Sequence, residues 1–182
     1  MMWVSLSSAV AAEMPQVWLS IGSNIDREAN IRGAVKSLRE AFGELVLSSV
    51  YESEAVGFDG EPFYNMVIGL KTDLPVRSLN NSIRDIEKKY GRVREGEKFS
   101  SRMLDIDLLL YGNEVINEGG LEIPRSEITQ YAFVLLPLAE VAGNVRHPAD
   151  SRTYQELWDG FDQKQQKLRQ VDFGFASVVA QL

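Results

Sequence analysis

A short charged stretch of the chain holds residue types from which a metal and phosphate site can be built. Residues 91–110 read GRVREGEKFSSRMLDIDLLL. Four cations come first, on a segment with few apolar residues: Arg92, Arg94, Lys98 and Arg102. Asp105 and Asp107 follow, within an apolar run that is typical of a strand. Residues i and i+2 of a strand share a face, with Cα atoms about 6.6 Å apart, so we expect both carboxylates to point the same way.

This arrangement indicates magnesium-dependent phosphoryl or diphosphoryl transfer. Two neighbouring carboxylates repel each other, and a bound divalent cation relieves that repulsion. Guanidinium groups hold phosphate oxygens by bidentate hydrogen bonds, whereas a lysine acts as a point charge. An Asp-x-Asp pattern is a weak signal by itself, and the alternative is an exposed strand face beside a solvated loop.

The composition of the chain narrows the possible chemistry. Its 182 residues are 45% hydrophobic, which is enough for one sizeable core, and we expect one domain over residues 14–182. The chain has no cysteine and a single histidine, which excludes thiol chemistry and disfavours His-rich metal sites and Ser-His-Asp triads. The net charge of −7 disfavours nucleic acid as a partner.

The N-terminal residues 1–13 are expected to be an extension that is disordered or results from a misassigned start. They are apolar, like part of a signal peptide, but they lack its basic segment. No run approaches the roughly 18 apolar residues of a membrane span, so we expect no membrane association. The expected location is therefore the cytoplasm.

The elements that position the charged residues follow from apolar periodicity. Strands are predicted at 17–21, 45–51, 64–70 and 104–111, with one helix capped by Asp26 and another from Pro75 to Tyr90. This βαββαβ order predicts a ferredoxin-like α+β fold, an antiparallel sheet with helices on one face. Additions are predicted after it: a hairpin near 114–117, helices at 133–141 and 154–161, and a partly helical C-terminal tail.

Two aromatic residues at the edges of predicted elements are candidates for holding a flat heterocycle. Phe63 and Phe133 have core packing as the ordinary explanation and a stacking slot as the alternative. Asn65 offers a donor and an acceptor to a ring edge, or it satisfies backbone groups. His147, next to Pro148, is interpreted as a turn residue. The sequence has neither a Walker A motif nor a G-x-G-x-x-G motif, which disfavours a P-loop or Rossmann nucleotide site.

Four motifs resemble a known family in their order and spacing. They are VWLSIGSN, EPFYNMV, GRVR followed by R-x-L-D-I-D, and FVLLPLAEVA. Over residues 15–150 the chain resembles the hydroxymethyldihydropterin pyrophosphokinases of folate synthesis. The resemblance implies a ferredoxin-like fold. It also implies transfer of diphosphate from ATP to the hydroxymethyl group of 6-hydroxymethyl-7,8-dihydropterin, with release of AMP.

The resemblance further implies roles for individual residues. Asp105 and Asp107 would bind two Mg²⁺ ions, while Phe63 and Phe133 would sandwich the pterin, with Asn65 at its edge. The remaining implied residues would bind ATP or act in catalysis: Arg92 and Arg102 at the phosphates, Arg94 and Lys98 on a closing loop, and Glu87 near the nucleotide.

Several positions depart from the family pattern. Arg125 replaces a usual histidine, and Tyr131 replaces a usual arginine, both at the expected ATP site. Lys98 and Phe99 replace an Arg-Trp pair. These changes leave two alternatives open: a divergent pterin-binding paralogue with little or no transfer, or a diphosphokinase for another hydroxymethyl heterocycle. A monomer or weak homodimer is expected.

Overall fold

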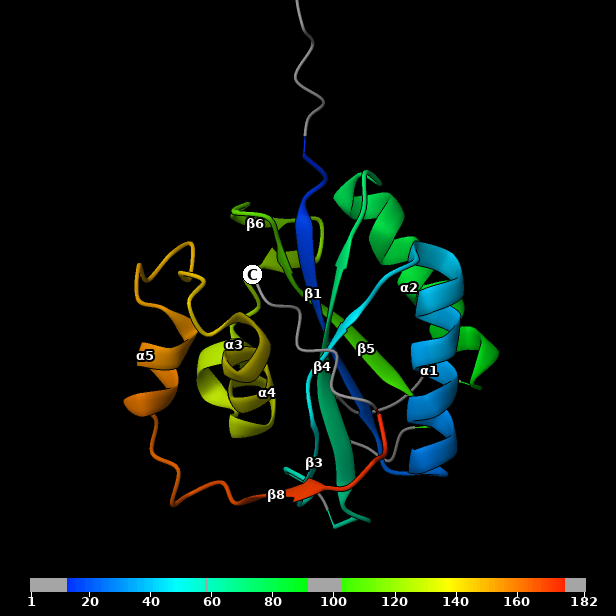
Figure 1. Cartoon of the computed structure of the whole chain (residues 1–182), viewed down its shortest axis with the longest axis vertical. Helices are drawn as coiled ribbons and strands as arrows, with labels where there is room; N and C mark the ends of the chain where they lie inside the picture. Colours follow the sequence, from blue (N-terminus) through cyan, green and yellow to red (C-terminus); the bar gives the residue numbers. More distant parts are fainter. Residues whose placement is uncertain (1–12, 58, 92–102, 176–182) are drawn as a thin grey trace, which may run out of the picture.

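A mixed-length antiparallel sheet forms the centre of the molecule in the computed structural model, which describes residues 13–57, 59–91 and 103–175 (Figure 1). Its main strands run in the order β5-β1-β4-β3-β8, and a short strand, β2, also pairs with β4. All of these pairings are antiparallel. The strands are β1 (Gln16–Ser23), β2 (Val46–Leu47), β3 (Val50–Ser53), β4 (Phe63–Lys71), β5 (Asp105–Tyr111) and β8 (Leu168–Val171).

Two long helices cover one face of this sheet (Figure 1). They are α1 (Arg27–Phe42) and α2 (Val76–Lys89). Each carries an apolar stripe at helical spacing, such as Leu79, Ile83 and Ile86 of α2, that is buried against the strands. The strand order and these helices confirm the predicted ferredoxin-like α+β fold.

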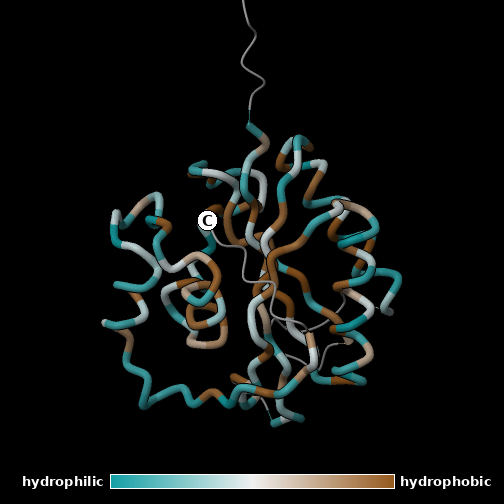
Figure 2. The backbone as a smooth tube through the Cα atoms, viewed as in Figure 1, coloured by the Kyte–Doolittle hydropathy of each residue, from teal (hydrophilic) through white to brown (hydrophobic). Residues whose placement is uncertain are grey.

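Three shorter helices lie beyond the other face of the sheet, and the strands between the two helical layers are rich in hydrophobic residues (Figure 2). Trp18, Val67 and Leu109 on the sheet form a second core with Leu135 and Leu138. These helices are α3 (Glu127–Gln130), α4 (Ala132–Ala142) and α5 (Tyr154–Asp159). A two-stranded hairpin precedes them, formed by β6 (Ile116–Glu118) and β7 (Leu121–Ile123).

Polar contacts fasten α4 to the sheet beside the second core. The Glu140 carboxylate accepts hydrogen bonds from the backbone N–H of Ser49 at 3.0 Å and from the Tyr51 hydroxyl at 3.0 Å. Burial, followed by the charge of Glu140, raises the pKa of Tyr51 to about 12. Tyr51 therefore remains a neutral donor at ordinary pH, and α4 has a fixed position over β3 and β4.

Two local expectations were wrong, and one is tested only in part. The strand predicted at 45–51 is broken because the Ser48 hydroxyl accepts the Val67 N–H at 2.9 Å, replacing a strand carbonyl. The described part of the tail predicted as partly helical contains the strand β8, which pairs with β3, and residues 176–182 lie outside the described residues. Asp26 adopts a left-handed conformation with φ 43° and makes no side-chain cap bond to α1.

Two further expectations concern the extent of the protein. Residues 1–12 lie outside the described residues, so a domain spanning 14–182 and a separate extension stay predictions. Within the described part of the chain, none of the helices has the length and apolar character needed to span a membrane.

Candidate active site

Three neighbouring strands place an amide, a glycine and a carboxylate in one row. Gly22 of β1 pairs with Asn65 of β4 on one side and with Asp105 of β5 on the other. One step along, Ser20 pairs with Asp107. Directly paired residues of antiparallel strands point to the same face. Asn65, Asp105 and Asp107 therefore share the face of the sheet that α4 covers farther along.

Gly22 lets the backbone of β1 lie close to two side chains of β4 in the middle of this row. A Cβ atom at Gly22 would lie 3.2 Å from Asn65 Oδ1 and 3.7 Å from the Phe63 ring. The first distance is tighter than an ordinary carbon–oxygen contact. Phe63 precedes Asn65 by two residues in β4, so its side chain belongs to the same face. The glycine thus provides a flat floor beside an aromatic ring and an amide.

The Asn65 amide is held in one orientation by its neighbours. Its Nδ2 donates to the Ser53 hydroxyl of β3 at 2.9 Å, and the side chain is only 4% exposed. The amide oxygen lies on the Gly22 side. A buried amide with a fixed orientation is suited to recognising the edge of a heterocycle. Sequence reasoning missed Ser53, because the strand predicted at 45–51 ended before it, whereas β3 extends to it.

The two aspartates alternate with core residues, as the sequence predicted. Ile106 and Leu108 are buried against the long helices, while the Asp107 side chain is 39% exposed. Carboxylate oxygens are ligands that Mg²⁺ prefers, and Mg²⁺ is usually held by one or two carboxylates together with substrate phosphates. The described residues contain no group of three or more Asp, Glu, His or Cys that could hold a metal. A pair of aspartates fits an ion that is shared with a polyphosphate.

Glu87 supports the aspartate strand from the opposite face. Its Oε1 atom accepts the backbone N–H of Ile106 at 2.9 Å, and the residue is 1% exposed. Ile106 separates the two aspartates in β5, the outermost strand of the sheet at this side. This geometry favours a positioning role for Glu87, and its contact with ATP stays a prediction.

Arg125, which is not part of a strand, lies next to Asp107. Its Nη2 atom lies 3.5 Å from Asp107 Oδ1 and 2.9 Å from Glu127 Oε1. Its backbone N–H donates to the Leu109 carbonyl of β5 at 3.1 Å, which fixes the residue beside that strand. Glu127 was not predicted as part of the site. A carboxylate two residues after Arg125 was the only feature of the sequence that pointed to this ion pair.

Tyr131 and Phe133 form a stacked aromatic pair at the start of α4. Their ring centroids are 5.1 Å apart and the rings are inclined by 17°. Gln166 accepts the N–H of the intervening Ala132 at 2.8 Å, so the backbone here is held as well. Tyr131 thus lies against the ring expected to hold the pterin, while its predicted contact with ATP remains untested.

The four cations of the charged segment lie outside the described residues, as does Phe99. The roles expected for Arg92, Arg94, Lys98 and Arg102 therefore stay predictions.

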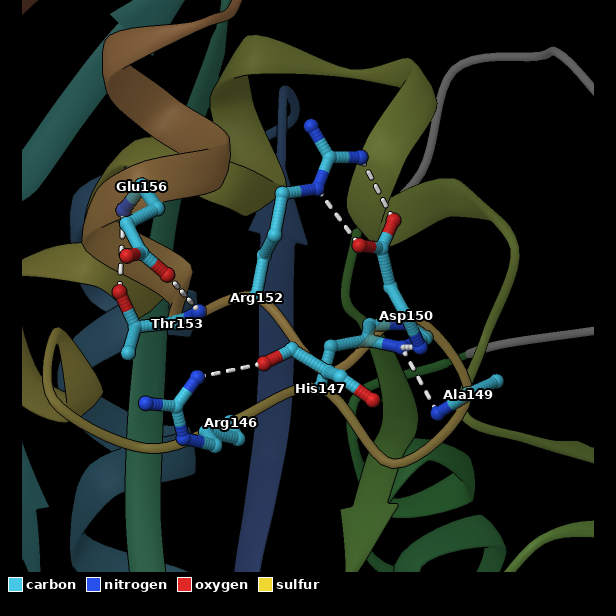
Figure 3. A network of polar contacts seen from close by, with 8 residues as sticks. Arg146, His147, Ala149, Asp150, Arg152, Thr153 and Glu156 are labelled. Carbon is cyan, nitrogen blue, oxygen red and sulfur yellow. Dashed lines mark hydrogen bonds and ion pairs between the residues drawn. The ribbon is translucent and has the colours of Figure 1, made fainter.

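The single histidine belongs to a turn, as expected (Figure 3). His147 Nδ1 accepts the backbone N–H groups of Ala149 and Asp150, both at 3.2 Å. Burial is the largest influence on the His147 pKa and lowers it; Asp150 raises it and Arg152 lowers it further. The histidine ring therefore serves as a neutral acceptor within the turn.

Comparisons with known proteins identify the family of the chain. Residues 18–143 match the family described as 7,8-dihydro-6-hydroxymethylpterin-pyrophosphokinase (HPPK). The 2-amino-4-hydroxy-6-hydroxymethyldihydropteridine pyrophosphokinase of Aquifex aeolicus is 38% identical over 146 residues, covering 79% of this chain and 91% of that protein. The enzyme of the same name from Bacillus subtilis is 36% identical, covering 74% of this chain and 82% of that protein.

Solved structures agree in fold. An HPPK-DHPS chain in complex with substrates matches 84% of this chain with a TM-score of 0.67 and 12% identity. Wild-type Plasmodium falciparum HPPK-DHPS with pteroate matches 81% with a TM-score of 0.64 and 16% identity. The present chain spans 44% and 42% of those two chains, so the likeness concerns one part of larger proteins. The sequence matches and the shared fold show that the chain belongs to the 7,8-dihydro-6-hydroxymethylpterin-pyrophosphokinase family.

Proposed function

We propose that this chain transfers diphosphate from Mg·ATP to the hydroxymethyl group of 6-hydroxymethyl-7,8-dihydropterin and releases AMP, as a step of folate biosynthesis. The observation that carries the proposal is the row of Asn65, Gly22 and Asp105 across three strands. It brings an amide suited to a heterocycle and a carboxylate suited to a metal ion onto the same face of the sheet.

The pterin-binding half of the site consists of Asn65 with Phe63 and Phe133. The oriented amide offers polar atoms to the ring edge, and Gly22 has no side chain that would cover the amide. The aromatic rings contribute stacking, which is worth about 0.5–1.5 kcal/mol for a ring pair beyond area burial. Fixing the ring in this way directs its hydroxymethyl group along the row toward the aspartates.

The phosphate-binding half consists of Asp105 and Asp107, with cations around them. Two Mg²⁺ ions held there would neutralise developing charge on the transferred group. Arg125 supplies a guanidinium near Asp107 within the described residues. By the family resemblance, Arg92 and Arg102 would contact phosphates, and Arg94 and Lys98 would lie on a segment that closes over ATP.

The proposed reaction is attack of the pterin hydroxyl oxygen on the β-phosphorus of ATP. A new P–O bond forms at the β-phosphorus, the bond to the α–β bridging oxygen breaks, AMP leaves, and the hydroxyl proton is released to solvent. Positioning and charge neutralisation supply most of the acceleration in such reactions. The chain's own contribution is to hold the hydroxyl oxygen and the β-phosphorus in line.

A pterin-binding protein with little transfer activity is the second candidate. Arg125 is engaged by two carboxylates, and Tyr131 stacks on Phe133 instead of contributing a positive charge. Losing one charge-assisted phosphate contact costs about 1.5–3 kcal/mol, which slows an enzyme by roughly ten- to a hundredfold or more. A site so weakened still binds pterin.

One assay separates these candidates. AMP release from Mg·ATP is measured with the hydroxymethyl pterin and with a 6-methyl analogue that lacks the hydroxyl. We expect AMP with the first compound and none above background with the second. Pterin binding without AMP release would establish the second candidate, and AMP release with another hydroxymethyl heterocycle alone would establish a different substrate.

The cellular setting is proposed on the same basis. A cytoplasmic location and a monomeric or weakly dimeric state fit an enzyme acting on small soluble substrates. Size-exclusion chromatography with light scattering tests the second point, with a stable dimer at micromolar concentration as the contradicting result.

A further inference from the structure

Arg125 is placed between two carboxylates that differ in their distance from it. Its Nη2 atom is 2.9 Å from Glu127 Oε1 but 3.5 Å from Asp107 Oδ1. The first separation is that of a charge-assisted hydrogen bond, whereas the second is an ion pair without a short bond. The guanidinium is therefore held firmly by Glu127 and loosely by Asp107.

The same guanidinium has unused hydrogen-bonding capacity. Its Nε atom is buried and has no partner among the described residues, although the side chain as a whole is 27% exposed. A guanidinium carries five N–H donors, and a buried donor without an acceptor is unfavourable. A phosphate oxygen arriving at this side of Asp107 would supply that acceptor.

The backbone keeps Arg125 next to β5 while its side chain is able to change partners. Its N–H donates to the Leu109 carbonyl, two residues beyond Asp107. This backbone bond keeps the Arg125 side chain within reach of Asp107.

We propose that Arg125 is an exchangeable counter-ion of Asp107. Without a divalent cation, Arg125 neutralises Asp107. When a nucleotide delivers the cation to Asp107, the guanidinium transfers to a phosphate oxygen while Glu127 retains it. This inference rests on the proposed function, because it takes Asp107 as a metal ligand and a nucleoside triphosphate as the ligand that brings the metal.

The exchange couples metal binding to nucleotide binding. A cation that arrives alone must displace Arg125 and leaves it with one acceptor fewer, so binding of the free ion is weakened. A cation that arrives with phosphates supplies the displaced guanidinium with a new partner, so binding of the complex is strengthened. Arg125 thereby favours the metal–nucleotide complex over the free metal.

The test is a pair of binding measurements on Arg125→Gln. Binding of Mn²⁺ alone is followed by electron paramagnetic resonance, and binding of Mg·AMPPCP, a non-hydrolysable ATP analogue, by calorimetry. We expect R125Q to bind Mn²⁺ alone about threefold to tenfold more tightly and Mg·AMPPCP about tenfold or more weakly. A residue that only supports the fold would weaken both, so opposite signs distinguish a counter-ion from a structural residue.

Two further variants sharpen the test. Arg77→Gln removes the same charge from an exposed ion pair with Glu118 (3.3 Å) and should change neither affinity. Glu127→Gln removes the firmer partner of Arg125, so Arg125 should compete more strongly for Asp107 and weaken binding of Mn²⁺ alone. The second variant keeps the proposal testable if R125Q fails to fold, which circular dichroism would show.

The outcomes distinguish this inference from the proposed function. Unchanged or weaker Mn²⁺ binding by R125Q, or unchanged Mg·AMPPCP binding, would overturn the counter-ion role. Neither measurement contains pterin, so failure of the wild-type chain to release AMP with pterin would overturn the transfer reaction alone. Opposite shifts in the two affinities would support the counter-ion role whichever alcohol accepts the diphosphate.

Discussion

Glu87 of α2 accepts a hydrogen bond from the backbone N–H of Ile106, the residue that separates Asp105 from Asp107. An edge strand has backbone groups without a strand partner, and here a buried carboxylate satisfies one of them. The packing of a helix on one face of the sheet thereby fixes the segment that carries, on the other face, the two carboxylates proposed to bind metal.

Replacing Glu87 by alanine should therefore destabilise the protein and reduce activity. The Ile106 N–H would lose its acceptor in a buried place, which costs about 1–3 kcal/mol of the free energy of unfolding. Urea denaturation measures this loss, and Glu87→Gln, which keeps an acceptor oxygen, should recover most of it. Asp85→Ala on the exposed side of the same helix is the control. Equal stability of E87A and wild type would contradict the role given to this bond.

Gly22→Ala should impair pterin binding with little effect on folding. The added methyl group would press on the Asn65 amide at 3.2 Å and shift it on the floor of the site. Because the Asn65 amide positions the ring, we expect its displacement by a few tenths of an ångström to raise the KM for pterin about tenfold. Gly160→Ala, where the nearest contact is an ordinary 3.5 Å, serves as the control. An unchanged KM for pterin in G22A would remove Gly22 from the site.

Tyr131→Ala decides whether Tyr131 serves the pterin or the nucleotide. Because its ring stacks on Phe133, its removal should free Phe133 and weaken pterin binding by about threefold to tenfold, leaving the KM for ATP unchanged. Phe161→Ala disrupts another stacked pair, with Trp158, and should alter neither constant. A rise in the KM for ATP alone would favour the nucleotide role expected from the sequence.

Much of this arrangement was predictable from local patterns. The alternation of Asp105 and Asp107 with apolar residues placed both carboxylates on one face, because a strand repeats every two residues. Apolar runs likewise located β1 and β4, whose pairing brings Asn65 next to Gly22.

The remaining features depend on contacts between distant segments. The sequence LRQV of β8 has no strong alternation, and it becomes a strand by pairing with β3 more than a hundred residues earlier. The bond between the Ile106 N–H and Glu87 was not predicted, because a buried carboxylate that accepts a backbone N–H has no local signature. The approach of Arg125 to Asp107 depends on the course of the chain after the β6–β7 hairpin.

The turn around His147 predicts a pH dependence of stability. Burial lowers the pKa of His147 in the folded protein from the ordinary 6.5, so the folded state favours the neutral ring. This stabilisation is fully present above pH 6.5 and is lost as the pH falls through the folded-state pKa. The chain has one histidine, so NMR of its ring protons in an untagged protein reports the pKa directly.

Replacing this histidine provides the matched test. His147→Asn should abolish the part of the loss in stability that begins as the pH falls below about 6.5, as measured by urea unfolding. A ring pKa at or above 6.5 in the folded protein would contradict the preference of this turn for the neutral ring.

The most direct test of the account is the effect of Asp107→Asn on transfer and on pterin binding. The substitution preserves size but removes a charge that the proposed mechanism needs for Mg²⁺ and ATP. We predict that pterin-dependent AMP release falls by a hundredfold or more, as a rough estimate for a lost electrostatic contact at the transferred group. Affinity for pterin alone should stay within about threefold, and Glu114→Gln, an exposed control on the turn after β5, should match wild type. AMP release by D107N at a rate near that of wild type would contradict the assignment of this carboxylate and the mechanism built on it.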